Sequence, residues 1–137
     1  MRSFLPVTAT ELCGDLPNRE LVVPKPAGGS GDALEWAEYE ATVDASLASL
    51  ELVRDTGEPV QRRIVLALDG DTIDWEHVVA ILIDGSDAED SVRRACEATT
   101  QDEADEALEE LLDFALQWYD ASERAGLARV LNGCVDL

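Results

Sequence analysis

The sequence predicts a single α+β domain over residues 1–137, in which helices pack against a three- to four-stranded mixed sheet. Two short apolar runs that end in Asp-Gly have the composition of buried strands. Around them, apolar residues recur at steps of three and four, which is the period of helices. No low-complexity linker divides the chain, and its 137 residues are enough to enclose one hydrophobic core.

Four short segments have the pattern of strands. The first, residues 2–7, contains Pro6, which cannot donate a hydrogen bond and therefore fits a sheet edge or a strand end. Residues 20–23 form a second apolar run. The clearest strands are 63–68 and 77–83, whose lack of polar alternation favours a sheet that helices cover.

Helices are expected between these strands and in the last third of the chain. A short helical turn is predicted near residues 8–12, and a capping box predicts a helix over about 32–53. A further helix is expected over about 87–98, followed by a long helix over 102–125. The predicted order of elements is therefore β-α-β-α-β-β-α-α.

The large aromatic residues are expected to lie mostly in the core. Trp36 and Tyr39 share one face of the 32–53 helix with four aliphatic residues, Val43, Leu47, Leu50 and Val53. Trp118 falls on the apolar side of the predicted 102–125 helix. The alternative for Trp118 and Tyr119 is the edge of a pocket or an interface, where such residues are enriched.

The charge balance is the strongest compositional signal. Thirty acidic and ten basic residues give a formal net charge of −20. Because phosphate binding depends on Lys and Arg, such a surface repels nucleic acids and anionic membranes, whereas it attracts basic proteins. We therefore expect a basic protein partner, no direct nucleic-acid binding and no membrane association.

The protein is expected in the cytoplasm. The first ten residues lack the apolar run and cleavage site of a signal peptide, and the longest apolar run, 78–83, is too short to span a bilayer. Cys13, Cys96 and Cys134 are odd in number, widely spaced and without a CxxC pair. This pattern favours free thiols in a reducing compartment.

The predicted 102–125 helix carries the candidate binding site. No basic residue occurs between Ala95 and Glu123, and at ~100° per residue the acids fall on one side of the helix. A basic partner is expected to dock on the carboxylates of Glu106, Glu109, Glu110, Asp113 and Asp120. Regularly spaced carboxylates can also imitate the phosphates of a nucleic acid. The alternative is a solvated face that only keeps the protein soluble.

The sequence shows no recognisable catalytic residue, metal site or cofactor site. His77 is the only histidine, and no nucleophile can be placed beside it. Carboxylates do cluster after the two clearest strands, where a hard cation would find oxygen ligands; they are Asp69, Asp71, Asp74, Glu76, Asp84, Asp87, Glu89 and Asp90. Turns and helix caps explain the same acids. A non-enzymatic interaction domain is the first hypothesis, and a small metal-dependent enzyme is the alternative.

Several short motifs follow one another in an order that resembles a known family. They are Arg2, Phe4, Leu5, Pro6 and Thr8; Glu35-Trp36 and Glu38-Tyr39; Ala48-Ser49-Leu50-Glu51-Leu52; Arg62-Arg63-Ile64-Val65-Leu66-Ala67; Ile83-Asp84; and Leu116-Gln117-Trp118-Tyr119. Together they resemble an uncharacterised actinobacterial family of small acidic proteins, a domain of unknown function. The chain departs from that pattern by lacking Val after the first Arg and by a shorter region after Ala67.

That resemblance covers about residues 2–125 and implies the fold and an actinobacterial host. Because the family has no assigned activity, the resemblance carries over no catalytic residue.

Overall fold

The computed structural model describes residues 2–25 and 31–132. In chain order its elements are β1 Arg2–Val7, the 3₁₀ turn η1 Thr10–Cys13, α1 Gly31–Thr56, β2 Ile64–Asp69, η2 Trp75–His77, β3 Val78–Ile83, η3 Ser86–Ala88, α2 Glu89–Glu97, α3 Gln101–Leu111, β4 Gln117–Asp120, η4 Ala121–Glu123 and α4 Arg124–Asn132. The strands form one sheet in the order β1-β2-β3-β4. The predicted α+β class is confirmed, but all three strand pairings are antiparallel, so the sheet is not mixed.

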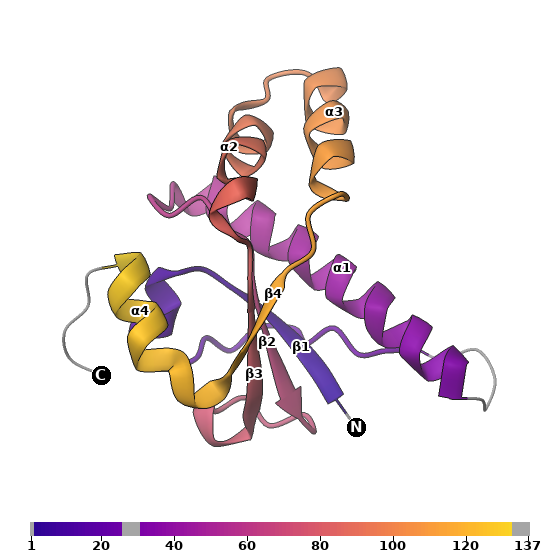
Figure 1. The fold of residues 1–137 in the computed structure, drawn as a ribbon, viewed down its shortest axis with the longest axis vertical. Helices are drawn as coiled ribbons and strands as arrows, with labels where there is room; N and C mark the ends of the chain where they lie inside the picture. The colour runs from indigo at the N-terminus through magenta and orange to yellow at the C-terminus, as the bar shows by residue number, and fades with distance from the viewer. Residues whose placement is uncertain (1, 26–30, 133–137) are drawn as a thin grey trace.

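Helices lie on both faces of the sheet (Figure 1). One helix, α1, crosses one face, while η1 and α4 lie on the other. The pair α2 and α3 packs at one end of the sheet, against the C-terminal half of α1. None of the described helices combines the length and apolarity needed to cross a membrane.

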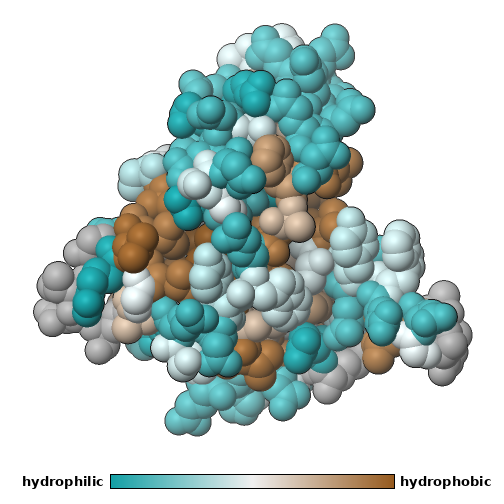
Figure 2. All heavy atoms as spheres, in the orientation of Figure 1, coloured by the Kyte–Doolittle hydropathy of each residue, from teal (hydrophilic) through white to brown (hydrophobic). Residues whose placement is uncertain are grey.

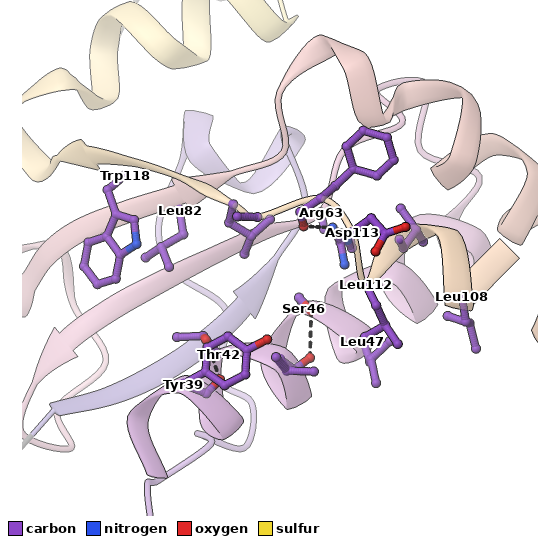
Figure 3. A pocket seen from close by; sticks show the side chains of 15 residues that line it. Tyr39, Thr42, Ser46, Leu47, Arg63, Leu82, Leu108, Leu112, Asp113 and Trp118 are labelled. Carbon is purple, nitrogen blue, oxygen red and sulfur yellow. Dashed lines mark hydrogen bonds between the residues drawn. The ribbon is translucent and has the colours of Figure 1, made fainter. Parts of the chain in front are cut away.

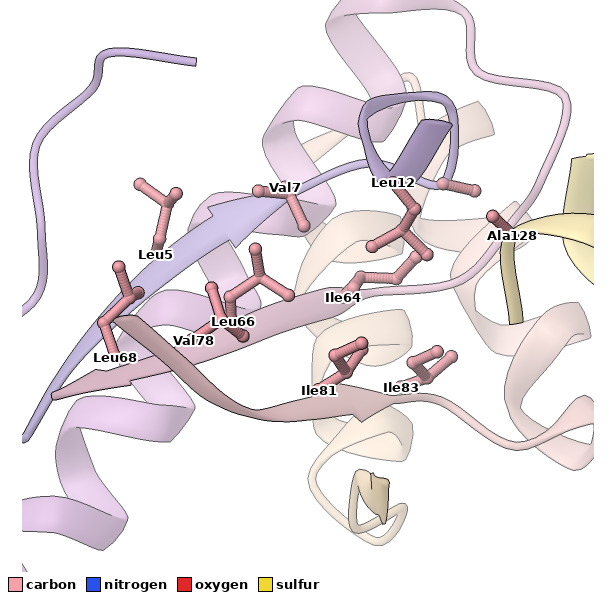
Figure 4. Packing of buried hydrophobic residues seen from close by; sticks show 11 residues of the cluster. Leu5, Val7, Leu12, Ile64, Leu66, Leu68, Val78, Ile81, Ile83 and Ala128 are labelled. Carbon is pink, nitrogen blue, oxygen red and sulfur yellow. The ribbon is translucent and has the colours of Figure 1, made fainter. Parts of the chain in front are cut away.

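The larger core cluster lies between the sheet and the η1–α4 side. Alternate residues of β1, β2 and β3 point toward Leu12 and Ala128, as Figure 4 shows. Six of the largest side chains in this cluster have almost no solvent exposure; they are Leu5, Leu12, Ile64, Leu66, Leu68 and Ile81. This packing explains why the strand sequences are apolar without alternation: the opposite face of each strand is covered as well.

On that opposite face, α1 packs through small residues. Ala37, Ala41, Ala45 and Ser49 recur every fourth position and are buried, so they form one side of the helix. The aromatic stripe lies on another side, and Trp36 is 62% exposed. The expectation of a core position for Trp36 and Tyr39 is therefore wrong. Of the same predicted stripe, Leu50 and Val53 are buried, because α2 and α3 cover that end of the helix.

Ser49 joins α1 to two strands. Its hydroxyl donates a hydrogen bond to the Val7 carbonyl at 2.8 Å and accepts one from the Ile64 amide at 2.9 Å. Val7 and Ile64 are opposite each other in the β1–β2 register. One fully buried hydroxyl therefore links the ends of the two strands and fixes the position of α1 over them.

The segment 20–23 forms a single bridge and not the predicted strand. Phe4 donates its amide to the Val22 carbonyl at 2.9 Å, and the Val22 amide bonds back to Phe4 at 2.8 Å. Pro24, which has no amide hydrogen, follows directly. With this bridge in the place of the second strand, the predicted order of elements holds as far as α3.

The predicted helix over 102–125 is wrong beyond Leu111. Here α3 ends, the chain turns through residues 112–116, and β4 and α4 follow. The amides of Asp113 and Phe114 bond to carbonyls three residues earlier, which tightens and closes the last turn.

Two physical reasons favour this break. The last turn of α3 has no basic residue, although the helix dipole favours cations there. In addition, the outward backbone groups of β3 need hydrogen-bond partners, and β4 supplies them by pairing with Ile81 and Ile83. Trp118 and Tyr119 have aromatic side chains that suit a strand.

Cysteine chemistry differs from the prediction at one position. Cys96 is a free thiol, as expected, but Cys13 is disulfide-bonded. The last residue of α4 lies beside η1 despite its distance along the sequence: the Asn132 side-chain amide donates to the Ala9 carbonyl at 2.6 Å and lies 3.6 Å from the Cys13 sulfur. Cys134 lies outside the described residues.

We predict that Ser49→Ala lowers the free energy of unfolding by about 1–3 kcal/mol, because it leaves a buried amide and a buried carbonyl without their shared partner. Urea denaturation with an unchanged m-value measures this change.

Ser46→Ala is the matched control on the same helix. Ser46 is also buried, but among the described residues its hydroxyl bonds to the Val43 carbonyl of its own helix and not to a strand, so we expect a change of about 0.5 kcal/mol or less. Equal effects of the two substitutions would contradict the role assigned to Ser49.

Candidate functional site

One of the surface hollows is a groove between α1 and β4, which we call the α1–β4 groove. Its volume is about 240 Å³. Figure 3 shows Tyr39, Thr42, Ser46 and Leu47 of α1 on one side and Trp118 on the other, with Leu112 and Asp113 near one end. The remaining lining residues are Val43, Arg63, Leu82, Leu108, Leu111, Phe114, Ala115 and Leu116.

Large apolar side chains around this groove are open to solvent. Tyr39 is 57% exposed, Trp118 is 56% exposed and Leu112 is 65% exposed. Trp36 stands next to Tyr39, with the two ring centroids 5.6 Å apart. In Figure 2, brown residues reach the surface mainly at the left, on the α4 side, and in a smaller area below α3, whereas α2 and α3 themselves are mostly hydrophilic. Such an exposed aromatic group is typical of an interaction surface.

The register of β4 places Trp118 on the α1 side of the sheet. Trp118 lies opposite Leu82, a member of the core cluster under α1. Asp120 lies opposite Ala80 of the same cluster, so its strand position faces the same side. Because Asp113 also lines the groove, two carboxylates flank Trp118 along the chain.

A buried ion pair fixes the floor of the groove. The Arg63 guanidinium donates two hydrogen bonds of 2.8 Å to the Asp84 carboxylate, and both side chains are almost fully buried. The same guanidinium donates to the Phe114 carbonyl at 3.2 Å. The pair therefore connects the start of β2, the end of β3 and the turn that leads into β4.

The five acids predicted to bind a partner do not form one stripe. Glu106 and Glu110 line a hollow beside α2, where Glu110 forms an ion pair of 2.6 Å with Arg94. Glu109 is exposed on α3. Asp113 lies at the groove, and Asp120 caps η4 with its carboxylate on the Ser122 amide. The structure brings only Asp113 and Asp120 near the aromatic residues, and it separates them from the acids on α3.

Four of the eight acids after the core strands, Asp74, Asp84, Glu89 and Asp90, have ion-pair partners within the described residues. Asp84 binds Arg63, Glu89 forms an ion pair of 2.7 Å with Arg62, and Asp90 forms one of 2.9 Å with Arg93. Within residues 2–25 and 31–132, no three His, Cys, Asp or Glu side chains gather in a way that could hold a metal ion. The structure thus gives no observation that favours the metal-dependent alternative.

His77 serves the local structure of the β2–β3 connection. Asp74 caps η2 by accepting the His77 amide at 3.1 Å, and its carboxylate also contacts the His77 ring at 2.5 Å. This hydrogen bond raises the pKa of His77 and lowers the pKa of Asp74. At Cys96, burial raises the pKa of the thiol, which disfavours the nucleophilic thiolate.

Comparison with known proteins gives a family for the chain. A model described as Family of unknown function (DUF6912) matches residues 1–128. The chain belongs to this family. The DUF6912 match confirms the prediction that the chain belongs to a family of unknown function. The actinobacterial host stays a prediction. No curated protein and no solved structure matches the chain.

Sequence reasoning missed the groove for an identifiable reason. In α1, alanines at every fourth position indicate that the helix packs against the sheet through small residues. Trp36 and Tyr39 lie on another side of the helix and therefore stay exposed to solvent. The alternative position considered for Trp118, at the edge of a pocket, is the one observed. Nothing in the local sequence indicated that Arg63 and Asp84 would pair, because this contact depends on the β2–β3 register.

We predict that Asp74→Asn lowers the pKa of His77, because the substitution removes the carboxylate that raises it. The raised pKa stabilises the fold below the unfolded pKa of His77, and this contribution is lost as pH rises through the folded pKa. The lowered pKa of Asp74 acts in the opposite sense, and its contribution is lost as pH falls through the folded value.

An NMR titration of the ring protons of His77 measures this pKa without overlap, since the chain has no other histidine. Asp71→Asn is the control, because it removes an exposed carboxylate of the same connection that does not contribute to the raised pKa of His77. The interpretation fails if both substitutions shift the pKa of His77 equally.

Proposed function

We propose that this protein is a non-enzymatic protein-interaction domain, and that its α1–β4 groove binds a basic segment of a partner protein. The observation that carries the proposal is that exposed Tyr39 and Trp118 side chains line one groove, with exposed Trp36 beside Tyr39. Aromatic residues contribute a large share of binding energy at protein interfaces because they bury much apolar area with few rotatable bonds.

Charge complementarity specifies the partner. The chain has a net charge of −20; Asp113 lines the groove with Trp118, and Asp120 lies two residues after Trp118 on the same face of β4. A partner segment with Lys or Arg beside apolar side chains would satisfy both parts of this surface, and the long-range field would accelerate its association.

The proposal differs from an acidic helix that docks along its whole length. Docking along residues 102–123 requires one continuous helix, whereas α3 ends at Leu111. Glu110 is also neutralised by Arg94 within the chain. For the same reason we do not extend the proposal to imitation of a nucleic acid, since the even spacing of carboxylates stops with the helix.

Selection from a displayed library of random twelve-residue peptides tests the proposal. We expect wild-type protein to enrich peptides that combine net positive charge with apolar residues. Trp118→Ala should weaken an enriched peptide at least about tenfold, since it removes an aromatic anchor. Fluorescence polarisation with the synthetic peptide measures the dissociation constant.

Two variants with equal charge change separate local recognition from general attraction. Asp113→Asn with Asp120→Asn should weaken the peptide and reduce the salt dependence of its binding. Glu40→Gln with Asp44→Asn is the control, because these exposed residues of α1 line a different hollow. Equal weakening by both pairs, or a selection that yields no convergent peptides, would contradict the proposal.

A further inference from the structure

The sheet ends in an open edge beside the groove. In the strand order, β4 has a neighbour on one side only, and Figure 1 shows it in front of the other strands with no helix over it. An edge strand presents backbone N–H and C=O groups that a second chain can pair with. Only the backbone groups of β4 that do not already pair with β3 are available for such pairing.

In an antiparallel sheet, successive residues of a strand direct their N–H and C=O groups alternately to one neighbouring strand and to the other. Asp84 donates its amide toward β2, to the Arg63 carbonyl at 3.1 Å, so Leu82 and Ala80 also direct their backbone groups toward β2. Ile81 and Ile83 then direct theirs toward β4, where Tyr119 and Gln117 are opposite them. It follows that the N–H and C=O of Trp118 point away from β3, toward the open edge.

The neighbouring residues agree with this alternation. The Asp120 amide donates to the Glu123 carboxylate at 2.9 Å and not to β3, as expected for a residue with the same orientation as Trp118. Among the residues that the structure describes, nothing accepts from the Trp118 amide or donates to its carbonyl. One residue of the edge therefore offers both a donor and an acceptor, and it is the residue whose side chain borders the groove.

From this arrangement we infer that the partner segment binds as an extended strand that pairs with the outer edge of β4, through the N–H and C=O of Trp118. This inference rests on the proposed function and names the mode of binding. Pairing of an extended peptide with a sheet edge draws affinity from backbone hydrogen bonds and specificity from alternate side chains.

Each face of the added strand meets a different surface. Side chains on the α1 side would lie beside Trp118 in the α1–β4 groove. Side chains on the other side would lie beside Tyr119, where Ile83, Leu127 and Leu131 line a second hollow. The partner should therefore carry apolar residues with a period of two, with basic residues able to reach Asp113 and Asp120.

Charge decides against a second copy of this chain as the occupant. Two copies would bring two net charges of −20 together at a strand only four residues long. A basic extended peptide brings the opposite charge to the same backbone groups. The occupant is therefore a heterologous basic strand.

N-methylation of an enriched peptide tests the inference. Two versions of the peptide are made: in one phase the amides of the odd-numbered residues are methylated, and in the other phase those of the even-numbered residues. Pairing with β4 predicts that one phase weakens binding more than about tenfold, while the other phase, whose methyl groups point away from β4, binds nearly as well as the parent peptide. Each version is the control for the other.

The alternative outcomes are distinct. Loss of binding in both phases indicates a helical peptide, and tolerance of both phases indicates docking by side chains alone; either result overturns strand pairing while the proposed function stands. If the unmodified peptide does not bind, the proposed function fails and the inference fails with it.

Amide hydrogen exchange rates of the protein provide an independent test of strand pairing. In the free protein the Trp118 amide should exchange faster than the Tyr119 amide, which donates toward β3. Saturating unmodified peptide should slow the Trp118 amide at least about tenfold, because the amide gains an acceptor. An unchanged rate at Trp118 in the saturated complex would overturn the inference.

Discussion

The ion pair between Arg63 and Asp84 holds together the parts of the molecule that form the groove. It joins the first residue before β2 to the first residue after β3 through side-chain and backbone hydrogen bonds, and it reaches Phe114 in the turn before β4. Because both charges are buried, each requires the other: removal of one partner from such a pair typically costs about 3–5 kcal/mol. The same geometry places β4 beside β3 and leaves a gap between β4 and α1.

The second constraint is the close approach of α1 to the sheet. Small residues at every fourth position let the helix lie near β1 and β2, and the Ser49 hydroxyl fixes this position. An amphipathic helix normally buries its largest apolar residues, but α1 buries alanines at its N-terminal half and exposes Trp36 and Tyr39. Exposure of these rings has no benefit for folding, since burial would stabilise the protein. It is consistent with selection for binding.

The sequence allowed prediction of elements whose pattern is local. The strands around Leu66 and Ile81 and the helix predicted over about 32–53 needed no tertiary information. The failure over residues 102–125 has a tertiary cause: residues 112–120 continue the apolar pattern of α3, yet the open backbone of β3 draws Gln117–Asp120 into the sheet. The acidic stripe was consequently predicted as one surface, and the fold divides it into acids beside α2 and acids beside Trp118.

The central claim is that the α1–β4 groove, and not another part of this acidic surface, recognises a basic segment. The three tryptophans provide a direct measurement, because Trp36 and Trp118 lie on the groove side while Trp75 lies on the opposite side, with its indole N–H on the Gly14 carbonyl and its ring against Arg124. Indole N–H resonances can be followed by NMR during titration with an enriched basic peptide. The account predicts shifts for Trp36 and Trp118 and none for Trp75. Shifts centred on Trp75, or equal shifts of all three, would contradict it.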